Sequence, residues 1–160
     1  MHAPTLPRRR ALSGIAAGGA ALVLRPVLAQ GTGVPLGTQL QAAIADFAAG
    51  QPVRSGRVTL EIASLVDNGN VVPVAITVDS PMTEAEHVRE IALYTDRNPQ
   101  REVLRCMLGP RSGRARVATR MRLATSQRVA ALARLSDGSV WMGAVDVVVA
   151  LAACLEGEGS

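Results

Sequence analysis

Short apolar segments of period two, separated by turn residues, follow one another from residue 57 to residue 150. This alternation is typical of β-strands with one buried face, and clusters of Gly, Pro, Asn, Asp and Ser mark the turns between them. The turn signals are Asp67-Asn68-Gly69-Asn70, Ser80-Pro81, Asn98-Pro99, Gly109-Pro110 and the hairpin signal Ser136-Asp137-Gly138. The predicted strands are 57–62, 71–79, 88–95, 102–108, 114–122, 127–135 and 140–150. Seven short strands favour an all-β, immunoglobulin-like β-sandwich.

One amphipathic helix is predicted before these strands. Thr38 is its expected N-terminal cap and Gly50 its expected end, while the Gly- and Pro-rich segment 30–37 reads as a leader. Residues 30–56 are therefore assigned to the leader and this helix. Helical spacing places a set of apolar residues on one face. These residues are Leu36, Leu40, Ile44 and Phe47.

Residues 1–29 have the pattern of a removable signal peptide. Arg8-Arg9-Arg10 forms a basic start, an Ala- and Gly-rich apolar stretch follows, and Val27-Leu28-Ala29 is a small-residue cleavage site. The paired arginines indicate the twin-arginine export route, although Ala11 stands where that motif usually has Phe. An N-terminal membrane anchor is the alternative, but the apolar stretch is shorter than the ~20 residues that a span needs. We therefore expect an exported, periplasmic protein.

Removal of the signal peptide changes the charge balance. All 17 basic residues are arginines, and four of them lie within residues 1–29, which contain none of the 13 acids. The remaining chain is balanced, so its composition predicts no nucleic-acid partner and no membrane partner. Its only aromatic residues are Phe47, Tyr94 and Trp141, so the core must be aliphatic.

The predicted strand 114–122 carries arginines on one face. Arg114, Arg116, Arg120 and Arg122 occupy even positions, and mostly apolar residues occupy the odd ones. The simpler interpretation is a solvated outer face of the sandwich. The alternative is a docking surface or a field that attracts an anionic cargo.

Residues for catalysis or metal binding are few. His87 is the only histidine after residue 29, so a catalytic triad or a zinc cluster would depend on one imidazole. We expect an ordinary structural role for His87, no cofactor, no metal and no enzymatic activity. Four methionines are interpreted as core filling rather than as soft-metal ligands. They are Met82, Met107, Met121 and Met142.

The two cysteines differ in their surroundings. Cys106 shares strand parity with Leu104 and Leu108, which predicts a buried thiol, whereas Cys154 precedes the acidic, Gly-containing end of the chain. An intramolecular disulfide between them is one alternative, and a separate, reactive Cys154 is the other. The pattern favours Cys154 as a tethered carrier thiol on a flexible tail at 152–160.

Several segments, taken in order, resemble the SoxY family of sulfur-oxidation carrier proteins. They are Asp67-Asn68-Gly69-Asn70-Val71-Val72-Pro73-Val74, Ser80-Pro81-Met82-Thr83-Glu84-Ala85, Asn98-Pro99, Thr119-Arg120-Met121-Arg122-Leu123-Ala124-Thr125-Ser126-Gln127 and Ser136-Asp137-Gly138-Ser139. The resemblance implies an immunoglobulin-like periplasmic subunit over 57–151 that pairs with a SoxZ-like subunit as a heterodimer. It also implies that Cys154 is the covalent attachment site for thiosulfate or other reduced sulfur. Cytochrome-linked and hydrolytic partner enzymes would then process this cargo.

The chain departs from the family pattern beside this cysteine. Where the family has Gly-Gly-Cys-Gly-Gly, this chain has Ala152-Ala153-Cys154-Leu155-Glu156 and four further residues. Side chains stiffen and thicken an arm that glycines would leave free, and the Glu156 carboxylate disfavours a nearby thiolate. Two further functions therefore stay open: a non-carrying SoxY-like interaction subunit with a vestigial or disulfide-bonded cysteine, and a secreted soft-metal binder.

Overall fold

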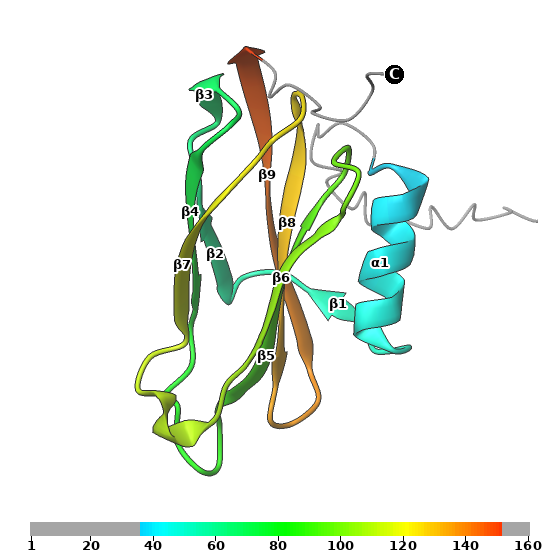
Figure 1. The fold of residues 1–160 in the computed structure, drawn as a ribbon. Coiled ribbons are helices and arrows are strands. Elements are labelled where there is room, and N and C mark those ends of the chain that lie inside the picture. The colour runs from blue at the N-terminus through cyan, green and yellow to red at the C-terminus, as the bar shows by residue number, and fades with distance from the viewer. Residues whose placement is uncertain (1–35, 152–160) are drawn as a thin grey trace, which may run out of the picture. The chain divides into compact units, whose positions relative to one another are not determined.

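The computed structural model describes residues 36–151 of the chain. They form two β-sheets packed face to face, with one helix on the outside of the larger sheet (Figure 1). The elements in chain order are α1 (Thr38–Ala48), β1 (Val53–Arg54), β2 (Val58–Glu61), β3 (Leu65–Asn68), β4 (Val72–Val78), β5 (Val88–Thr95), β6 (Glu102–Met107), the 3-10 helix η1 (Pro110–Ser112), β7 (Arg116–Met121), β8 (Gln127–Leu135) and β9 (Val140–Leu151). The predicted immunoglobulin-like β-sandwich with a preceding helix is confirmed. The predicted signal peptide, most of the leader and the tail lie outside the described residues.

The larger sheet has the strand order β1-β9-β8-β5-β6, and the smaller sheet has the order β2-β4-β7. Strand β9 also pairs with β3, which lies further along the same edge as β1. Both β1 and β3 run parallel to β9, whereas β8 runs antiparallel to it. The chain thus crosses to the smaller sheet at β2 and returns at β3.

All seven predicted strands are present, with bounds that differ from the prediction by at most two residues. Two further strands, β1 and β3, escaped prediction. β1 begins the sandwich at Val53, within the segment assigned to the leader and helix, and β3 takes up the start of the predicted turn at Asp67. The turn itself follows β3, where the Asn68 side-chain oxygen accepts a 2.9 Å hydrogen bond from the Asn70 N–H.

The predicted hairpin turn between β8 and β9 is confirmed. Gly138 has φ +83°, a conformation that favours glycine, and its N–H donates to the Leu135 carbonyl. The Asp137 carboxylate accepts a 2.8 Å hydrogen bond from the Ser139 N–H. Hydrogen bonding by the Ser139 side chain, together with this backbone bond, holds the pKa of Asp137 below its ordinary value.

Strands β5 and β8 are buried on both faces because each lies between the sandwich core and the helix. Ile91, Leu93 and Val129 face the smaller sheet, whereas Ala92 and Ala130 face α1. Alternation along a strand produces this division. The small alanine side chains leave room for the helix to pack closely on the outer face.

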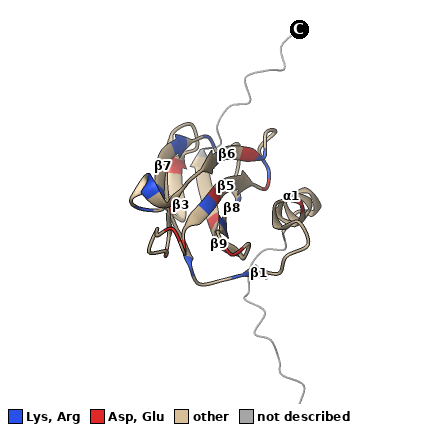
Figure 2. Ribbon diagram, turned by 90° about the horizontal axis from the view of Figure 1, so that it is seen from below, with Lys and Arg blue, Asp and Glu red and all other residues tan. Residues whose placement is uncertain are grey.

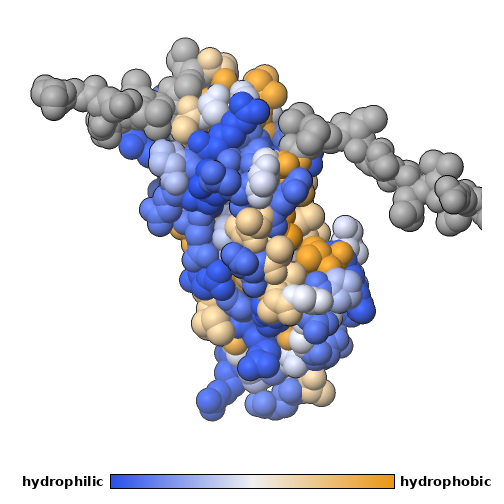
Figure 3. All heavy atoms as spheres, turned by 90° about the vertical axis from the view of Figure 1, so that its right-hand side faces the viewer, coloured by the Kyte–Doolittle hydropathy of each residue, from blue (hydrophilic) through white to orange (hydrophobic). Residues whose placement is uncertain are grey.

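Helix α1 buries Leu40, Ile44 and Phe47, as the spacing predicts. The expected capping role of Thr38 is wrong: Thr38 is the first helical residue, Gly37 holds the cap position, and no side chain caps the helix. The helix ends at Ala49, whose φ of 50° is left-handed and is followed by Gly50 with φ +82°. Seen from the side of α1, the surface is mainly hydrophilic with a narrow run of apolar residues (Figure 3).

A group of polar and aromatic side chains fastens the end of α1 to the larger sheet. The rings of Phe47 and Tyr94 meet edge to face at 6.5 Å, and the Arg105 and Arg134 guanidiniums lie 5.6 and 5.0 Å from the Phe47 ring centre. Arg105 also donates to Glu90 at 2.5 Å and to the Tyr94 hydroxyl at 2.7 Å. Burial raises the pKa of Tyr94 to about 12, so the hydroxyl stays protonated.

Gly143 allows the chain to cross from β1 to β2. A Cβ atom at this position would lie 2.4 Å from the Val58 carbonyl oxygen, inside the contact distance of the two atoms. Val58 begins β2, so the backbone of the smaller sheet passes directly over β9 here.

No helix among residues 36–151 is long and apolar enough to cross a membrane.

We predict that Gly143→Ala lowers the free energy of unfolding by about 1–3 kcal/mol, the usual cost of inserting atoms into a packed site. Gly109→Ala is the matched control, because Gly109 has no atom within 4 Å of an added Cβ and a φ of −147°. Urea denaturation followed by circular dichroism measures both variants. Equal stability of the two variants would contradict the close approach of β2 to β9.

Candidate functional site

Segments that are distant in sequence gather at the end of the sandwich where β9 finishes (Figure 1). We call this the exit end and define it by residues 67–70, 96–99, 122–127 and 148–151. Cys154, which lies outside the described residues, is the third residue after Leu151, the last residue of β9. The exit end is therefore the described part of the fold nearest in sequence to the predicted attachment site.

Asn98 joins two loops of the exit end. Its side-chain amide donates a 2.7 Å hydrogen bond to the Arg122 carbonyl. Its side-chain oxygen accepts from the Ala124 N–H at 3.0 Å and from the Gln127 amide at 2.7 Å. The loop between β7 and β8 is thereby tied to the loop between β5 and β6.

Gln127 extends this network from a buried position, with 6% of its surface exposed. Its side-chain amide also donates to the Thr125 carbonyl at 3.1 Å, and its side-chain oxygen accepts from the Arg97 N–H at 2.7 Å. A buried amide with three satisfied hydrogen bonds orders its surroundings, since losing any partner would leave a polar group unpaired.

The last residues of β9 are held on both sides. Pairing with β8 ends at Val147, and beyond it Val148 lies opposite Leu65 of β3. The Val148 N–H donates to the Ser64 carbonyl at 2.8 Å, and the Val149 N–H donates to the Ser126 hydroxyl at 2.9 Å. The segment that leads to Cys154 thus starts from a fixed position at the exit end.

Cys106 lies on the edge strand β6, opposite Ile91, and is half-buried against the sandwich core. Burial raises the pKa of the Cys106 thiol above its ordinary value. Because the thiolate is the reactive form, Cys106 is a poor nucleophile at neutral pH. The parity-based prediction of a buried thiol is therefore correct only in part: Cys106 packs against the core but is not fully buried.

The strand registers separate Cys106 from the exit end. Cys106 faces Ile91, Ile91 faces Ala133, and Ala133 faces Trp141 at the start of β9. Trp141 precedes Leu151 by ten residues, which corresponds to about 33 Å of strand.

Three further residues span at most about 11 Å, and a disulfide requires Cα atoms within about 7 Å. An intramolecular Cys106–Cys154 bridge would therefore require the end of β9 to leave the sheet. This geometry favours the alternative in which the two thiols act separately.

His87 and the methionines have structural positions. The His87 ring Nδ1 lies 3.1 Å from the Thr83 carbonyl. Met82 and Met121 are buried in the core, whereas Met107 is 72% exposed on β6. Core filling therefore accounts for the first two and not for Met107. Among residues 36–151 no three His, Cys, Asp or Glu side chains are grouped as metal ligands.

The arginine-bearing strand is β7, which lies at an edge of the smaller sheet (Figure 2). Arg116, Arg120 and Arg122 are exposed and Met121 is buried, as the alternation predicts. Thr119, on the inward face, is exposed because this edge of the sandwich is open.

A family model described as sulfur oxidation protein SoxY matches residues 44–154. The chain belongs to the SoxY family. This match covers most of the described sandwich and ends at the residue predicted to carry sulfur. A search of curated protein sequences finds no significant match.

Solved structures share the fold. The sulfur carrier protein SoxY from Chlorobium limicola f thiosulfatophilum is 22% identical, with a TM-score of 0.58 over 69% of this chain and 94% of that protein. The superoxide reductase (neelaredoxin) from Ignicoccus hospitalis is 19% identical, with a TM-score of 0.52 over 59% of this chain and 80% of that one. The superoxide reductase from Nanoarchaeum equitans is 12% identical, with a TM-score of 0.51 over 60% of this chain and 100% of that one. The same sandwich thus occurs in proteins of different function, and at these identities the likeness shows the fold alone.

Sequence reasoning assigned no role to Asn98, Ser126 or Gln127, although all three lie in segments that resemble the SoxY family. The signal that could have found them is their residue type: Asn, Ser and Gln in loops carry side chains that bond to backbone groups. Only the topology shows that these loops meet beside the end of β9.

We predict that Asn98→Ala destabilises the exit end, lowering the free energy of unfolding by about 2 kcal/mol, because the Arg122 carbonyl, the Ala124 N–H and the Gln127 amide each lose a partner. Hydrogen exchange should accelerate in residues 122–127. Asn68→Ala is the control, since the exposed Asn68 side chain accepts one local hydrogen bond. Similar exchange in both variants would contradict the role assigned to Asn98.

We predict that iodoacetamide alkylates Cys106 at least about tenfold more slowly in the folded Cys154→Ser variant than in the same variant unfolded in urea at pH 7.5, since burial lowers both access and thiolate content. The raised pKa of Cys106 requires the folded-state rate to rise at higher pH than it does for an ordinary cysteine. Mass spectrometry of the Cys106 peptide measures both rates. Equal rates in the two states would show that Cys106 is an accessible thiol.

Proposed function

We propose that this chain is an exported carrier subunit of sulfur oxidation, in which Cys154 holds sulfur intermediates while partner enzymes transform them. The observation that carries the proposal is the SoxY family match, which extends through Cys154. The position of the exit end supports it, because a fixed strand end lies three residues before the thiol.

The chemistry of loading needs one thiol and an external oxidant. The Cys154 sulfur and the outer sulfur of thiosulfate form an S–S bond, which releases the thiol proton and two electrons. A cytochrome-linked partner accepts these electrons. A hydrolytic partner then attacks the terminal sulfonate with water, which releases sulfate and leaves the remaining sulfur on Cys154. In this proposal the carrier is a substrate subunit, and the partner enzymes supply the catalytic groups.

A SoxZ-like subunit is the proposed partner in a heterodimer. Leu65, Val71 and Val148 are exposed to 63%, 62% and 54% near the exit end. Large exposed apolar side chains at one end of a small domain support contact with another protein. The proposal places this complex in the periplasm, after cleavage of the signal peptide at Ala29.

A second function, a non-carrying interaction subunit, is favoured by the residues that flank Cys154. Ala152, Ala153, Leu155 and Glu156 stand where the family has glycines. Larger side chains limit both the backbone freedom of an arm and its entry into a narrow active site. This alternative keeps the fold and the partner but removes the cargo.

We predict that protein isolated without reductant from thiosulfate-oxidising cells contains a chain beginning at Gln30 with an added S₂O₃ group, which reductant removes and peptide mapping places on Cys154. Cys154→Ser should abolish the adduct, because no other reactive thiol exists in the chain after residue 29. Cys106→Ser should retain it. Intact-mass spectrometry measures all three proteins.

A wild-type mass without any adduct after thiosulfate feeding would contradict the carrier proposal. The variant with glycine at positions 152, 153, 155 and 156 then separates two causes. Loading of this variant alone would assign the failure to the flanking residues and favour the non-carrying subunit, whereas an adduct that persists in Cys154→Ser would place the cargo elsewhere.

A further inference from the structure

Strand β7 combines a free strand edge with a row of arginines. In the described part of the chain β7 pairs with β4 alone, so its other edge offers unpaired backbone groups. By alternation Arg116 and Arg120 lie on its outer face, and Arg122 continues the row directly after it, whereas Arg114 precedes a tight turn in which the Arg116 N–H donates to the Arg114 carbonyl. A strand edge of this kind can accept an added strand.

Little negative charge balances this row. Glu61 of β2 pairs with Arg116 at 3.1 Å, and both side chains are about half exposed. Arg122 lies 3.4 Å from the side-chain oxygen of Asn70, which carries no charge. Arg114 and Arg120 form no ion pair with any residue between 36 and 151. The row therefore presents net positive charge to solvent.

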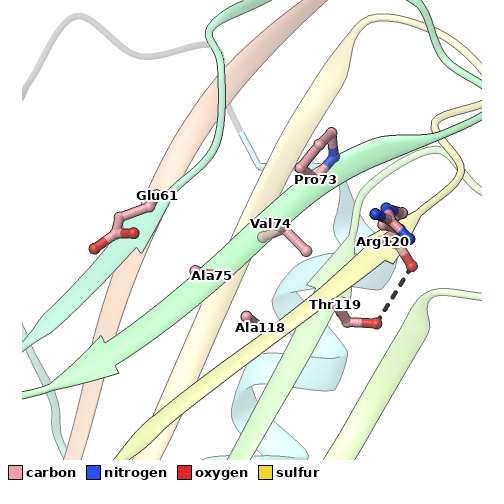
Figure 4. A pocket seen from close by; sticks show the side chains of 7 residues that line it. All are labelled: Glu61, Pro73, Val74, Ala75, Ala118, Thr119 and Arg120. Atoms are coloured by element: carbon pink, nitrogen blue, oxygen red, sulfur yellow. Dashed lines mark hydrogen bonds between the residues drawn. The ribbon is translucent and has the colours of Figure 1, made fainter.

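The outer face beside the row is hollowed. A depression of about 670 Å³ lies over β4 and β7, with Glu61 and Arg120 on opposite sides of it (Figure 4). Pro73, Ala75 and Ala118 line the depression between them, and their short side chains do not fill it. The opposite face of the same strands is filled by the sandwich core, so only the outer face has this unfilled space.

The length of the row selects the kind of ligand. Arg122 lies six residues after Arg116, which corresponds to about 20 Å along the strand. A small anion contacts one or two of these arginines, whereas an extended peptide with carboxylates at alternate positions meets the row along its length. The free backbone edge adds hydrogen bonds that only a peptide can make.

We propose that the free edge and outer face of β7 bind an extended acidic segment of a partner protein, which adds as a strand and pairs its alternate carboxylates with Arg120 and Arg122. This surface is separate from Cys154, and the proposal does not depend on whether that cysteine carries sulfur. Because the charges are exposed, binding must weaken as salt is added.

The test uses the full chain and a synthetic eight-residue peptide with glutamate at alternate positions and threonine or valine between them. A second peptide of the same composition with the glutamates grouped together is the control for net charge. Two-dimensional NMR titrations should show shifts concentrated in β7 and β4, and about tenfold tighter binding of the alternating peptide. Arg120→Glu/Arg122→Glu should abolish this preference.

Arg89→Glu/Arg97→Glu is the matched control, because both side chains are exposed and form no ion pair with residues 36–151. This variant should bind the alternating peptide as the wild type does. Equal binding of the two peptides, or equal loss in both double variants, would overturn the proposal in favour of general charge attraction. Shifts of β7 by thiosulfate alone at the same concentration, or tighter binding of duplex DNA or anionic vesicles, would overturn it in favour of those ligands.

Discussion

Strand β9 is the element on which the rest of the fold depends. Its twelve residues pair with β8 along one edge and with both β1 and β3 along the other. Between these two parallel partners the chain leaves for the smaller sheet, and it can do so only because Gly143 offers no side chain to the Val58 carbonyl. The same strand then ends beside Ser126, three residues before Cys154, the proposed attachment site.

The outer faces of the two sheets differ in what covers them. The larger sheet is covered on its outer face by α1, and the Phe47, Tyr94 and Arg105 group holds the helix there. The outer face of the smaller sheet has no such cover within residues 36–151, and its arginines stay in solvent. Cys106 is half-buried on β6, the edge strand farthest from β1 in the larger sheet, and burial raises the pKa of its thiol. The charged surface is therefore kept away from the packed interior.

Much of the sandwich was predictable because its long strands alternate and its turns use residues with specific conformations, such as Gly138. The short strands β1 and β3 were not, since two to four residues carry no period and their partner β9 lies more than eighty residues later. The packing of Cys106 against the core was predictable from strand parity. The gathering of Asn98, Ser126 and Gln127 beside Val149 could not be inferred, because it depends on which loops the topology brings to one end. The role assigned to Cys154 rests on the sequence and the family resemblance, since this residue lies outside the described residues.

The central claim is that the fold presents Cys154 as a single thiol that Cys106 cannot reach. Its most direct test is mild oxidation of the dilute full chain under native conditions, followed by non-reducing peptide mapping of the monomer. The account predicts no peptide that joins Cys106 to Cys154, because β9 ends about 33 Å along the strand from the level of Cys106, farther than the chain from Leu151 to Cys154 can span. A Cys106–Cys154 peptide in the folded monomer would contradict it.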